Sequence, residues 1–358
     1  MEKLRVGFIG TGYTVGIANM HLRGYANVSE DCELVALYDI VPGRAAQWAK
    51  ERELNVTICE SIDELLGMVD VVSLCVPNDQ HIPLLLKCYE AHKHVLCEKP
   101  ISVDADTARE AVANEPDDRI HMVGFTYRGI PALRYMKKII DEGKMGRIFT
   151  YRETLGGCRI ANHDVKLEWR MQKKLSGTGA LADFGCHMID LCDWLIGGTE
   201  GPVTHVNGMY TRSVMQRADI ATGEMSDVTN DDSASFTLKF ESGALASFVA
   251  SRLGVVRHTL EIYGEGGMML FRDDKPNEVE IWLKELGGAY NDANHQTIQV
   301  PEELVTIPWQ NAEFVDFIDC IKNNRKPQRS LQRGLYIQTI VDAAEKACET
   351  GDTIAMKE

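Results

Sequence analysis

The chain lacks several features that mark membrane, secreted or nucleic-acid-binding proteins. No apolar run approaches the ~20 residues that a bilayer-spanning helix needs. The first residues lead directly into a strand-like segment, without the apolar stretch of a signal peptide. Basic residues are in the minority, 38 against 53 acidic ones, and a formal charge of −15 argues against a nucleic-acid or anionic-membrane surface. We therefore expect a cytoplasmic protein that binds neither nucleic acid nor membrane.

The 10 cysteines contain no C-x-x-C pair, and many lie inside apolar runs, as Cys75, Cys97 and Cys192 do. This distribution is typical of buried free thiols in a reducing compartment and not of a disulfide framework. Internal repeats and low-complexity segments are also missing. A length of 358 residues, with 44% hydrophobic and 25% charged residues, fits a globular protein of two domains.

Residues 1–125 alternate between short apolar segments and amphipathic ones. Near-continuous apolar strands separated by helices predict a parallel sheet that is covered on both faces. The predicted strands are residues 4–9, 34–38, 69–76, 95–97 and 120–124, and the predicted helices are residues 17–25, 43–53, 61–66, 82–91 and 103–114. Ser102 and Asp104 are both candidates to cap the last of these helices.

The pattern changes after residue 125. Helices are predicted at 131–142, 181–196, 311–323 and 331–350, and strands at 148–155, 234–240, 244–251, 258–263 and 268–271. Consecutive short strands with glycine-containing turns predict an antiparallel sheet. The acidic stretch 219–232 has no apolar period and predicts an exposed loop. We expect an α/β chain with two domains, residues 1–125 for a dinucleotide and residues 126–358 for substrate binding and oligomerisation.

The first chemical motif is Gly10-Thr11-Gly12, directly after the first predicted strand. That context strengthens an otherwise weak glycine pattern. The first glycine permits a tight turn, and the second lets the backbone approach a pyrophosphate at a helix N-terminus. The third position of the usual G-x-G-x-x-G pattern is Val15, with Gly16 one place later, which indicates a turn expanded by one residue.

Asp39 ends the second predicted strand and bears on the choice of cofactor. A carboxylate there can accept hydrogen bonds from the adenosine ribose and would repel a 2′-phosphate, which favours NAD over NADP. Arg44 is the contrary signal, because an arginine just past the strand could meet that phosphate.

The third and fourth strand ends should face the same ligand. His81 either contributes chemistry there or simply opens the following helix, since lone histidines often have structural roles. The predicted cofactor-binding residues are Gly10, Gly12, Tyr13, Thr14, Asp39, Ile40, Arg44, Cys75, Val76, Pro77, Asn78, His81, Glu98 and Lys99.

Lys99 lies between Glu98 and Pro100, where an apolar run ends. The proline restricts the local backbone, so this lysine is better fixed than a typical loop lysine. Hydride transfer from a secondary alcohol needs a base for the hydroxyl proton and a group that stabilises developing alkoxide character. A partly desolvated lysine can stabilise that charge and join a proton relay, because its pKa shifts readily.

Asp183 and His187 are the matching pair. Four residues apart on a predicted helix, they share one face, where a carboxylate can fix the imidazole tautomer and support a general base. The alternative is a helix-capping aspartate with a core histidine. A metal site that pairs His187 with His163 is not supported, because no third ligand has suitable spacing, and we predict no metal.

Together these motifs resemble the glucose–fructose oxidoreductase / inositol dehydrogenase / rhizopine-catabolism (Gfo/Idh/MocA) family over essentially the whole chain. Any one motif is weak, but the set is specific in this order and spacing: Gly10-x-Gly12, Asp39, Pro77-Asn78-x-x-His81, Glu98-Lys99-Pro100, Gly124-Phe125-x-Tyr127-Arg128, Gly185-x-His187-x-x-Asp190 and Ile262-Tyr263-Gly264. The resemblance implies a Rossmann domain followed by a domain with a large, mainly antiparallel open sheet. That sheet often forms homodimer or homotetramer contacts in the family.

The resemblance also implies NAD(P)-dependent oxidation or reduction of a sugar, sugar derivative or cyclitol, with Lys99, Asp183 and His187 as the catalytic residues. Substrate contacts are expected from polar and aromatic side chains, because a polyol needs several donors, acceptors and a flat apolar face. The candidates are Tyr127, Arg128, Arg159, Trp169 and Arg170. Arg170 could equally pair with Glu168 or Asp183 as part of the scaffold.

Two other functions are compatible with the same motifs. An NAD-dependent glycosidase would oxidise its sugar only transiently and release no net NADH. A non-catalytic nucleotide-sensing protein would have no need of Lys99, Asp183 and His187, so their presence argues against it. The sequence does not identify the substrate hydroxyl or the physiological direction.

Overall fold

The computed structural model describes residues 2–13, 15–220, 222–254, 256–284 and 295–356. The chain forms two compact units. The first consists of Met1–Thr126, Lys174–Gly177 and Gln310–Gln338, and the second of Tyr127–Lys173, Thr178–Trp309 and Thr339–Glu358. Among the described helices, none combines the length and the apolar character needed to cross a membrane.

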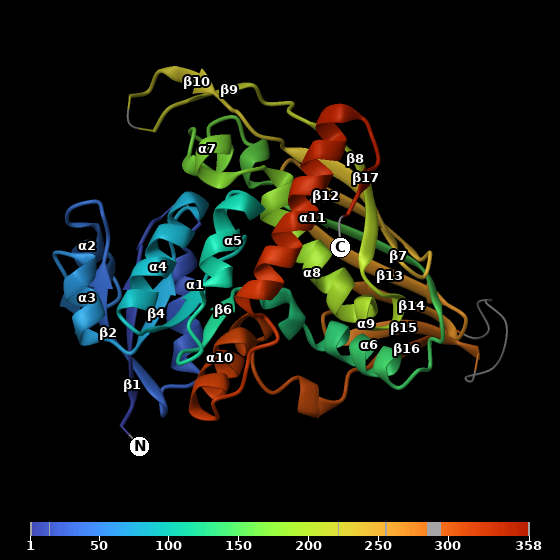
Figure 1. Ribbon diagram of the computed structural model, residues 1–358, viewed down its shortest axis with the longest axis horizontal. Helices are drawn as coiled ribbons and strands as arrows, with labels where there is room; N and C mark the ends of the chain where they lie inside the picture. The colour runs from blue at the N-terminus through green and yellow to red at the C-terminus, as the bar shows by residue number, and fades with distance from the viewer. Residues whose placement is uncertain (1, 14, 221, 255, 285–294, 357–358) are drawn as a thin grey trace. The chain divides into compact units, whose positions relative to one another are not determined.

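The first unit contains a six-stranded parallel sheet with the order β3-β2-β1-β4-β5-β6. Its strands are β1 (Leu4–Ile9), β2 (Cys32–Tyr38), β3 (Thr57–Ile58), β4 (Val71–Leu74), β5 (His94–Cys97) and β6 (His121–Val123). The helices between them are α1 (Ile17–Ala26), α2 (Arg44–Lys50), α3 (Ile62–Met68), α4 (His81–Glu90) and α5 (Ala105–Ala113) (Figure 1). Asp104, not Ser102, caps α5, because its carboxylate accepts the amide of Thr107 at 2.7 Å.

Helix α10 (Ala312–Lys322) returns to this first unit from far along the sequence. Phe314 and Phe317 are fully buried in one core with Phe8, Tyr25 and residues of β2. The ring of Phe314 also packs edge-on against Tyr25, at 5.1 Å between centroids. This return could not be predicted from the sequence, because an apolar helix face does not specify which sheet it covers.

The second unit is built on a nine-stranded sheet with the order β16-β15-β14-β13-β7-β12-β11-β8-β17. Only β12 and β7 run parallel among these pairs; the other described pairs are antiparallel. The strands are β7 (Ile148–Gly156), β8 (Val203–Thr211), β11 (Ser233–Phe240), β12 (Leu245–Ser251), β13 (Arg257–Gly264), β14 (Gly267–Arg272), β15 (Glu278–Leu283), β16 (Gln296–Gln299) and β17 (Ile354–Ala355). The predicted fold class, a parallel sheet followed by a mainly antiparallel one, is therefore confirmed.

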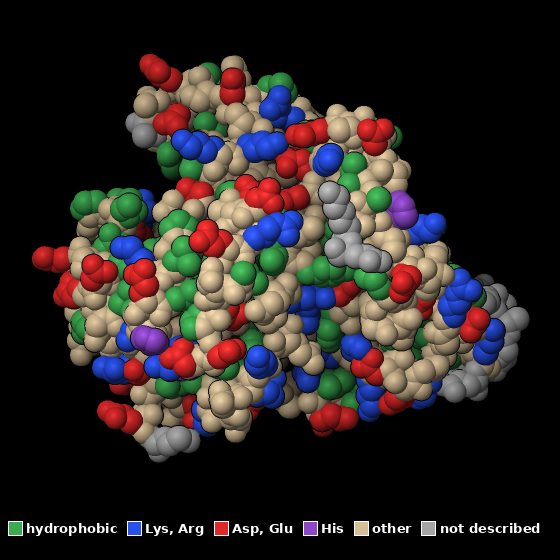
Figure 2. All heavy atoms as spheres, viewed as in Figure 1, with side chains coloured by type: hydrophobic (Ala, Val, Ile, Leu, Met, Phe, Trp, Pro, Cys, Tyr) green, Lys and Arg blue, Asp and Glu red, His purple; other side chains and the backbone are tan. Residues whose placement is uncertain are grey.

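Helices cover one face of this larger sheet. Figure 1 shows α6 (Pro131–Asp141), α8 (Cys186–Cys192) and α9 (Gly198–Glu200) in front of its strands. Side chains alternate along the strands, so that Phe236 and Phe248 stack beneath the helices, 4.6 Å between ring centroids. The short helix α7 (Lys173–Ser176) and the long helix α11 (Leu331–Thr350) each contribute residues to both units. On the face shown in Figure 2, acidic and basic side chains are interspersed.

The stretch 219–232 differs from the predicted exposed loop. Strand β9 (Gln216–Ala218) pairs with β10 (Met225–Asp227) in a two-stranded ribbon. The residues that follow, Asn230, Asp231 and Asp232, are buried. The carboxylates of Asp231 and Asp232 accept backbone amides, which a pattern based on hydropathy alone cannot reveal.

Candidate active site

The turn Gly10-Thr11-Gly12 of the first unit is packed closely at Gly10 and open at Gly12. The amide of Gly10 donates to the carbonyl of Tyr38 at 2.9 Å, and a Cβ atom on Gly10 would lie 2.4 Å from the carbonyl oxygen of Cys75. A Cβ atom on Gly12 would meet no atom of the described residues within 4 Å. Packing among the described residues therefore does not explain the second glycine, and the open position leaves room for a phosphate group.

Helix α1 begins directly after this turn. Its N-cap is Gly16, in the left-handed conformation (φ 69°), and among the described residues no side chain caps this end. The first amides of a helix bind anions well, because they are not used within the helix and lie at the positive end of its dipole. The turn and the helix thus fit the pyrophosphate of a dinucleotide. Thr14, also predicted to contact the cofactor, lies outside the described residues.

Asp39 holds the glycine turn in place. One carboxylate oxygen accepts the amide of Thr11 at 2.8 Å and its hydroxyl at 2.9 Å, while the other accepts the amide of Val41 at 2.9 Å. Arg44 contacts this second oxygen at 3.4 Å, and only 3% of the Asp39 side chain is exposed. The residue predicted to bind the ribose therefore also fixes the turn from the adjacent strand.

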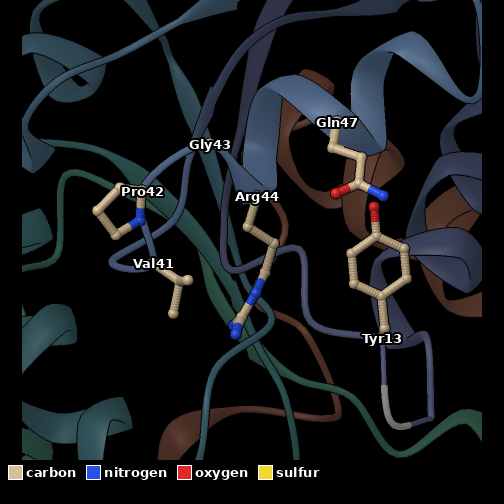
Figure 3. Close-up of a pocket in the computed structure, with 6 residues that line it drawn as sticks. All are labelled: Tyr13, Val41, Pro42, Gly43, Arg44 and Gln47. Atoms are coloured by element: carbon tan, nitrogen blue, oxygen red, sulfur yellow. The ribbon is translucent and has the colours of Figure 1, made fainter.

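A cavity of about 420 Å³ is lined in part by Val41 and Arg44, both of which contact Asp39. Its lining residues are Tyr13, Val41, Pro42, Gly43, Arg44 and Gln47, and Figure 3 shows Val41 and Pro42 on one side of Arg44 and Tyr13 on the other. The size suits an adenine ring with part of its ribose, since ligand cavities measure roughly 300–1,000 Å³. Of the predicted cofactor-binding residues, Tyr13 and Arg44 line this cavity. Ile40, predicted for the same role, is 82% exposed and is not among the lining residues.

Two of the cofactor-binding residues predicted after β4, Asn78 and His81, form hydrogen bonds with neighbouring loops. Asn78 is buried and donates to the carbonyl of Ser176 at 2.8 Å. His81 is fully buried, with Nδ1 at 2.8 Å from the carbonyl of Pro100 and Nε2 at 3.2 Å from that of Val76. Burial lowers the pKa of His81, although the two carbonyls oppose the shift. The imidazole therefore ties the loop that carries Lys99 to the end of β4.

A buried acid–base pair lies directly before Lys99. Glu98 contacts Nε2 of His21 at 2.9 Å, and its other oxygen accepts the amide of Lys99 at 3.3 Å. Burial alone would raise the pKa of Glu98, but the hydrogen bond from His21 and the nearby cations outweigh it and hold that pKa below its usual value. Burial and the charge of Glu98 raise the pKa of the neighbouring Glu313 to about 8. Lys99 thus follows a carboxylate that stays ionised.

The predicted pair Asp183 and His187 lies on one helical run in the second unit. Residues Leu181–Gly185 form a π-helical turn that continues into α8 at Cys186. Asp183 therefore lies in the wide turn and His187 in the α-helix that follows. His187 is only 5% exposed. Local π-helical turns are often found at functional sites, and this one separates the two predicted residues by about one turn.

The start of that helical run is anchored by Asp231, which the sequence did not single out. The Asp231 carboxylate accepts the amides of Gly179 and Leu181, the latter at 3.1 Å. Arg252 donates to the carbonyl of Asp231, and to the side chain of Asn230 at 2.8 Å. These contacts between residues far apart in sequence fix the position of the turn that carries Asp183.

Tyr127 is the centre of a group of aromatic rings around His187. The centroid of its ring lies 4.5 Å from that of His187, 5.3 Å from His258 and 5.5 Å from Trp309. Tyr127 was predicted to bind substrate, and the structure places it against the predicted base. His258 and Trp309 were missed, because neither is part of a recognisable motif.

The other predicted substrate residues have partners within the same unit. Buried Arg128 forms a double hydrogen bond with Asp190, and Arg159 pairs with the buried carboxylate of Glu168. The guanidinium of Arg170 lies over the ring of Trp169, at 4.2 Å from its centroid. A half-buried indole with an arginine on its face offers a flat surface and donors for a polyol.

Two buried arginines hold the segment that carries Arg159, Trp169 and Arg170. Arg217, on β9, donates to the carbonyls of Ile160, Asn162 and Val165. Arg252, just after β12, donates to the carbonyl of Arg170 at 2.7 Å. Hydrogen bonds from Arg217 and Arg252 to its carbonyl groups therefore hold this segment in place. A local sequence pattern could not predict these contacts, because the two arginines are distant in sequence.

Family models match both parts of this description. Residues 4–125 match the "Oxidoreductase family, NAD-binding Rossmann fold" model, and residues 133–270 match the "GFO/IDH/MocA C-terminal domain" model. The chain belongs to the Gfo/Idh/MocA family of NAD(P)-dependent oxidoreductases and carries its NAD-binding Rossmann domain.

The most similar proteins include dehydrogenases of sugars and inositol. Levoglucosan dehydrogenase of Pseudarthrobacter phenanthrenivorans is 28% identical, over 78% of this chain and 76% of its own length. Inositol 2-dehydrogenase of Rhizobium meliloti is 28% identical, over 78% of both chains. A solved structure of levoglucosan dehydrogenase with NADH has a TM-score of 0.88 at 24% identity, covering 100% of each chain. This last likeness shows the common fold.

Proposed function

We propose that this protein is a dehydrogenase that transfers a hydride between a secondary hydroxyl of a sugar, sugar derivative or cyclitol and a nicotinamide cofactor. His187 takes the hydroxyl proton, Asp183 orients the imidazole and supports its cationic form, and Lys99 polarises the substrate oxygen. The bound nicotinamide supplies the hydride acceptor in this reaction.

The observation that carries the proposal is the position of His187. Its imidazole is buried against Tyr127, and Asp183 lies about one turn earlier on the same helical run. A buried histidine with a carboxylate near it can exchange a proton close to neutral pH. Lys99 supports the assignment, since Glu98 and the His81–Pro100 contact hold its backbone on both sides.

The substrate class is proposed from the second unit and from the relatives. The Trp169–Arg170 pair provides a flat apolar surface with donors, which suits a polyhydroxylated ring. The 28%-identical relatives named above act, by their names, on levoglucosan and on inositol. A compound of this chemical class fits both observations.

The cofactor is proposed to be NAD, with NADP less favoured. Asp39 places a nearly buried negative charge beside the cavity, and a second negative charge from a 2′-phosphate would be repelled there. Arg44 lines the same cavity but already contacts Asp39. Titration of the protein with NADH and NADPH tests this choice, and tighter binding of NADPH would overturn it.

A homodimer or homotetramer through the nine-stranded sheet is part of the proposal. The face of β12 opposite the helices carries Leu245 and Val249, 50% and 48% exposed, where a polar face would be usual. Light scattering coupled to size-exclusion chromatography measures the subunit number, and a monomer at micromolar concentration would contradict this part.

Lys99→Ala tests the reaction itself. Turnover of a panel containing levoglucosan, myo-inositol and simple aldoses is followed through the absorbance of NADH. We expect Lys99→Ala to lower kcat by at least about 10²-fold and to change NAD affinity little, because the lost group acts on the substrate oxygen. Lys87→Ala, an exposed lysine of α4, is the matched control.

Each outcome of this experiment distinguishes the candidate functions. Undiminished turnover in Lys99→Ala would contradict the assigned role. Cleavage of a glycoside without net NADH would identify an NAD-dependent glycosidase. NAD binding without either reaction, over the whole panel, would support a nucleotide sensor.

A further inference from the structure

A buried chain of three polar side chains lies in the second unit behind the ring of Tyr127. The hydroxyl of Tyr151 donates to one oxygen of Glu153 at 2.6 Å, and Nε2 of His258 lies 2.7 Å from the other. Exposure is 0% for Tyr151, 3% for Glu153 and 4% for His258. Tyr151 and Glu153 lie on β7 and His258 lies on β13, so these three hydrogen-bonded side chains connect two antiparallel neighbouring strands.

The surroundings of the Glu153–His258 pair contain few other charges. Phe271 packs edge-on against His258, at 5.1 Å between centroids. The negative charge of Asp190, on α8, raises the pKa of Glu153. Arg128 pairs with Asp190 through a double hydrogen bond. The titratable groups that face the pair are therefore Tyr151, Asp190 with Arg128, Tyr127 and, beyond Tyr127, His187.

Tyr127 connects this pair to the proposed base. Its ring packs on His258 at 5.3 Å and on His187 at 4.5 Å, with interplanar angles of 42° and 44°. Packed rings transmit a change of position, because a well-packed interior has little free volume. Charges also interact over several ångströms in such surroundings, where the effective dielectric constant is far below that of water.

We propose that His258, held by Glu153, is a positioning residue that sets the orientation of the Tyr127 ring and the proton affinity of His187. The proposal rests on the proposed function, in which His187 exchanges the hydroxyl proton. In that step His187 becomes cationic, and the nearby carboxylate of Glu153, linked through His258, stabilises the positive charge.

A purely structural role does not account for an ionisable pair at this depth. Replacing a buried ion pair by well-packed apolar residues is often neutral or stabilising, so stability gives little reason for its presence. Burial raises the pKa of Glu153, and the contacts with His258 and Tyr151 oppose that shift. The pair can therefore respond to a proton gained or lost nearby.

Glu153→Gln is the decisive variant, because it keeps the shape and removes the charge. Glu261→Gln is the matched control: it makes the same change on β13, where Glu261 faces the opposite side of the sheet and pairs with Arg152 at 3.1 Å. The titration of the histidine rings is followed by NMR in the apo protein, with His187→Asn and His258→Asn used to assign the two signals. The pH dependence of kcat/KM is measured on whichever sugar of the panel is turned over.

We expect Glu153→Gln to lower the pKa of His187 by about half a unit, because its cationic form loses a stabilising negative charge. The acid limb of the kcat/KM profile should move to lower pH by the same amount, while NADH affinity and the Glu261→Gln profile stay unchanged. Unaltered titration of His187 in Glu153→Gln would overturn the proposal.

A second variant keeps the test decisive if Glu153→Gln does not fold. His258→Gln removes the imidazole and should shift the titration of His187 measurably, and an unchanged titration there would also overturn the proposal. The NMR measurement needs no substrate, so it separates the two hypotheses. A panel without turnover counts against the proposed function alone, and an unaffected His187 counts against the inference alone.

Discussion

The tripeptide Gly-Thr-Gly occurs twice in this chain, at residues 10–12 and 177–179, and each copy leads into a helical segment. The first glycine has a positive φ in both, 96° for Gly10 and 71° for Gly177. In both, a Cβ atom at that glycine would lie 2.4 Å from a carbonyl oxygen of another segment. The two turns are thus equivalent in their first half.

The two turns differ at their second glycine. In the part of the chain that the structure describes, no atom lies within 4 Å of a Cβ position on Gly12, whereas a Cβ atom on Gly179 would lie 1.7 Å from the carbonyl oxygen of Asp231. Each turn is also anchored by an aspartate, Asp39 at the amide of Thr11 and Asp231 at the amide of Gly179. The same tripeptide therefore leaves room for a ligand in the first copy and packs against the protein's own backbone in the second.

The comparison separates two reasons for a glycine that the sequence alone does not distinguish. An open Cβ position leaves room for an external group where the turn also precedes a helix N-terminus, as at Gly12, and a glycine in contact with backbone serves the fold. Substitution of the second glycine in each copy should therefore affect different properties: stability at residue 179 and cofactor affinity at residue 12.

The largest effect is expected from Gly179→Ala. The added methyl group overlaps the Asp231 carbonyl, so the backbone must move, and we expect a loss of at least about 3 kcal/mol of unfolding free energy. Urea denaturation measures it. Gly198→Ala, with open space around its Cβ position at the start of α9, is the matched control. A Gly179→Ala protein as stable as the wild type would remove the distinction between the two turns.

A smaller loss is expected from Asp231→Asn. The carboxylate accepts the amides of Gly179 and Leu181 with its two oxygens, and an asparagine can accept only one of them. Leaving one buried amide unsatisfied should lower stability by about 2 kcal/mol. Turnover should fall more than NADH affinity, because the affected turn carries Asp183. Asp227→Asn, an exposed change on β10, should leave both quantities within error.

If the Asp231 variant loses NADH affinity and keeps its turnover, the anchor does not act on the helix that carries Asp183 and His187. Stability within about 0.5 kcal/mol of the wild type, the usual range for surface changes, would show that the two amides find other partners.

The parts of the fold that the sequence predicted well are those set by local patterns. Helix α11 and strand β1 have the predicted bounds, because a continuous apolar period defines each of them. Strand β3 is only two residues long and was missed, since so short a segment has no measurable period. Strand β10 was predicted as part of the loop 219–232, because the acidic residues of that stretch hide the strand signal.

The candidate site divides in the same way. Residues within motifs, such as Gly10 and Lys99, could be predicted as site residues because each motif is typical of one kind of chemistry, and their roles stay predictions. Residues that support the site across long sequence distances, such as Arg217, Asp231 and His258, were not found, because no local pattern identifies a buried partner. These distances, 50 residues or more for Asp231 and its amide donors, become contacts only in the folded chain.

The smallest change in stability, and the clearest change in binding, is expected from Gly12→Ala. None of the described residues occupies the Cβ position, so the unfolding free energy should stay within about 0.5 kcal/mol of the wild type. The methyl group would lie where the pyrophosphate approaches the backbone, and NADH affinity should fall at least about 10-fold. Gly67→Ala, another open position in the same unit, on α3, should keep full affinity and gain some stability from helix propensity. Calorimetric titration with NADH measures both variants. Equal affinity in Gly12→Ala and Gly67→Ala would mean that the open side of the first turn does not receive the phosphate, and the two Gly-Thr-Gly turns would then differ only in packing.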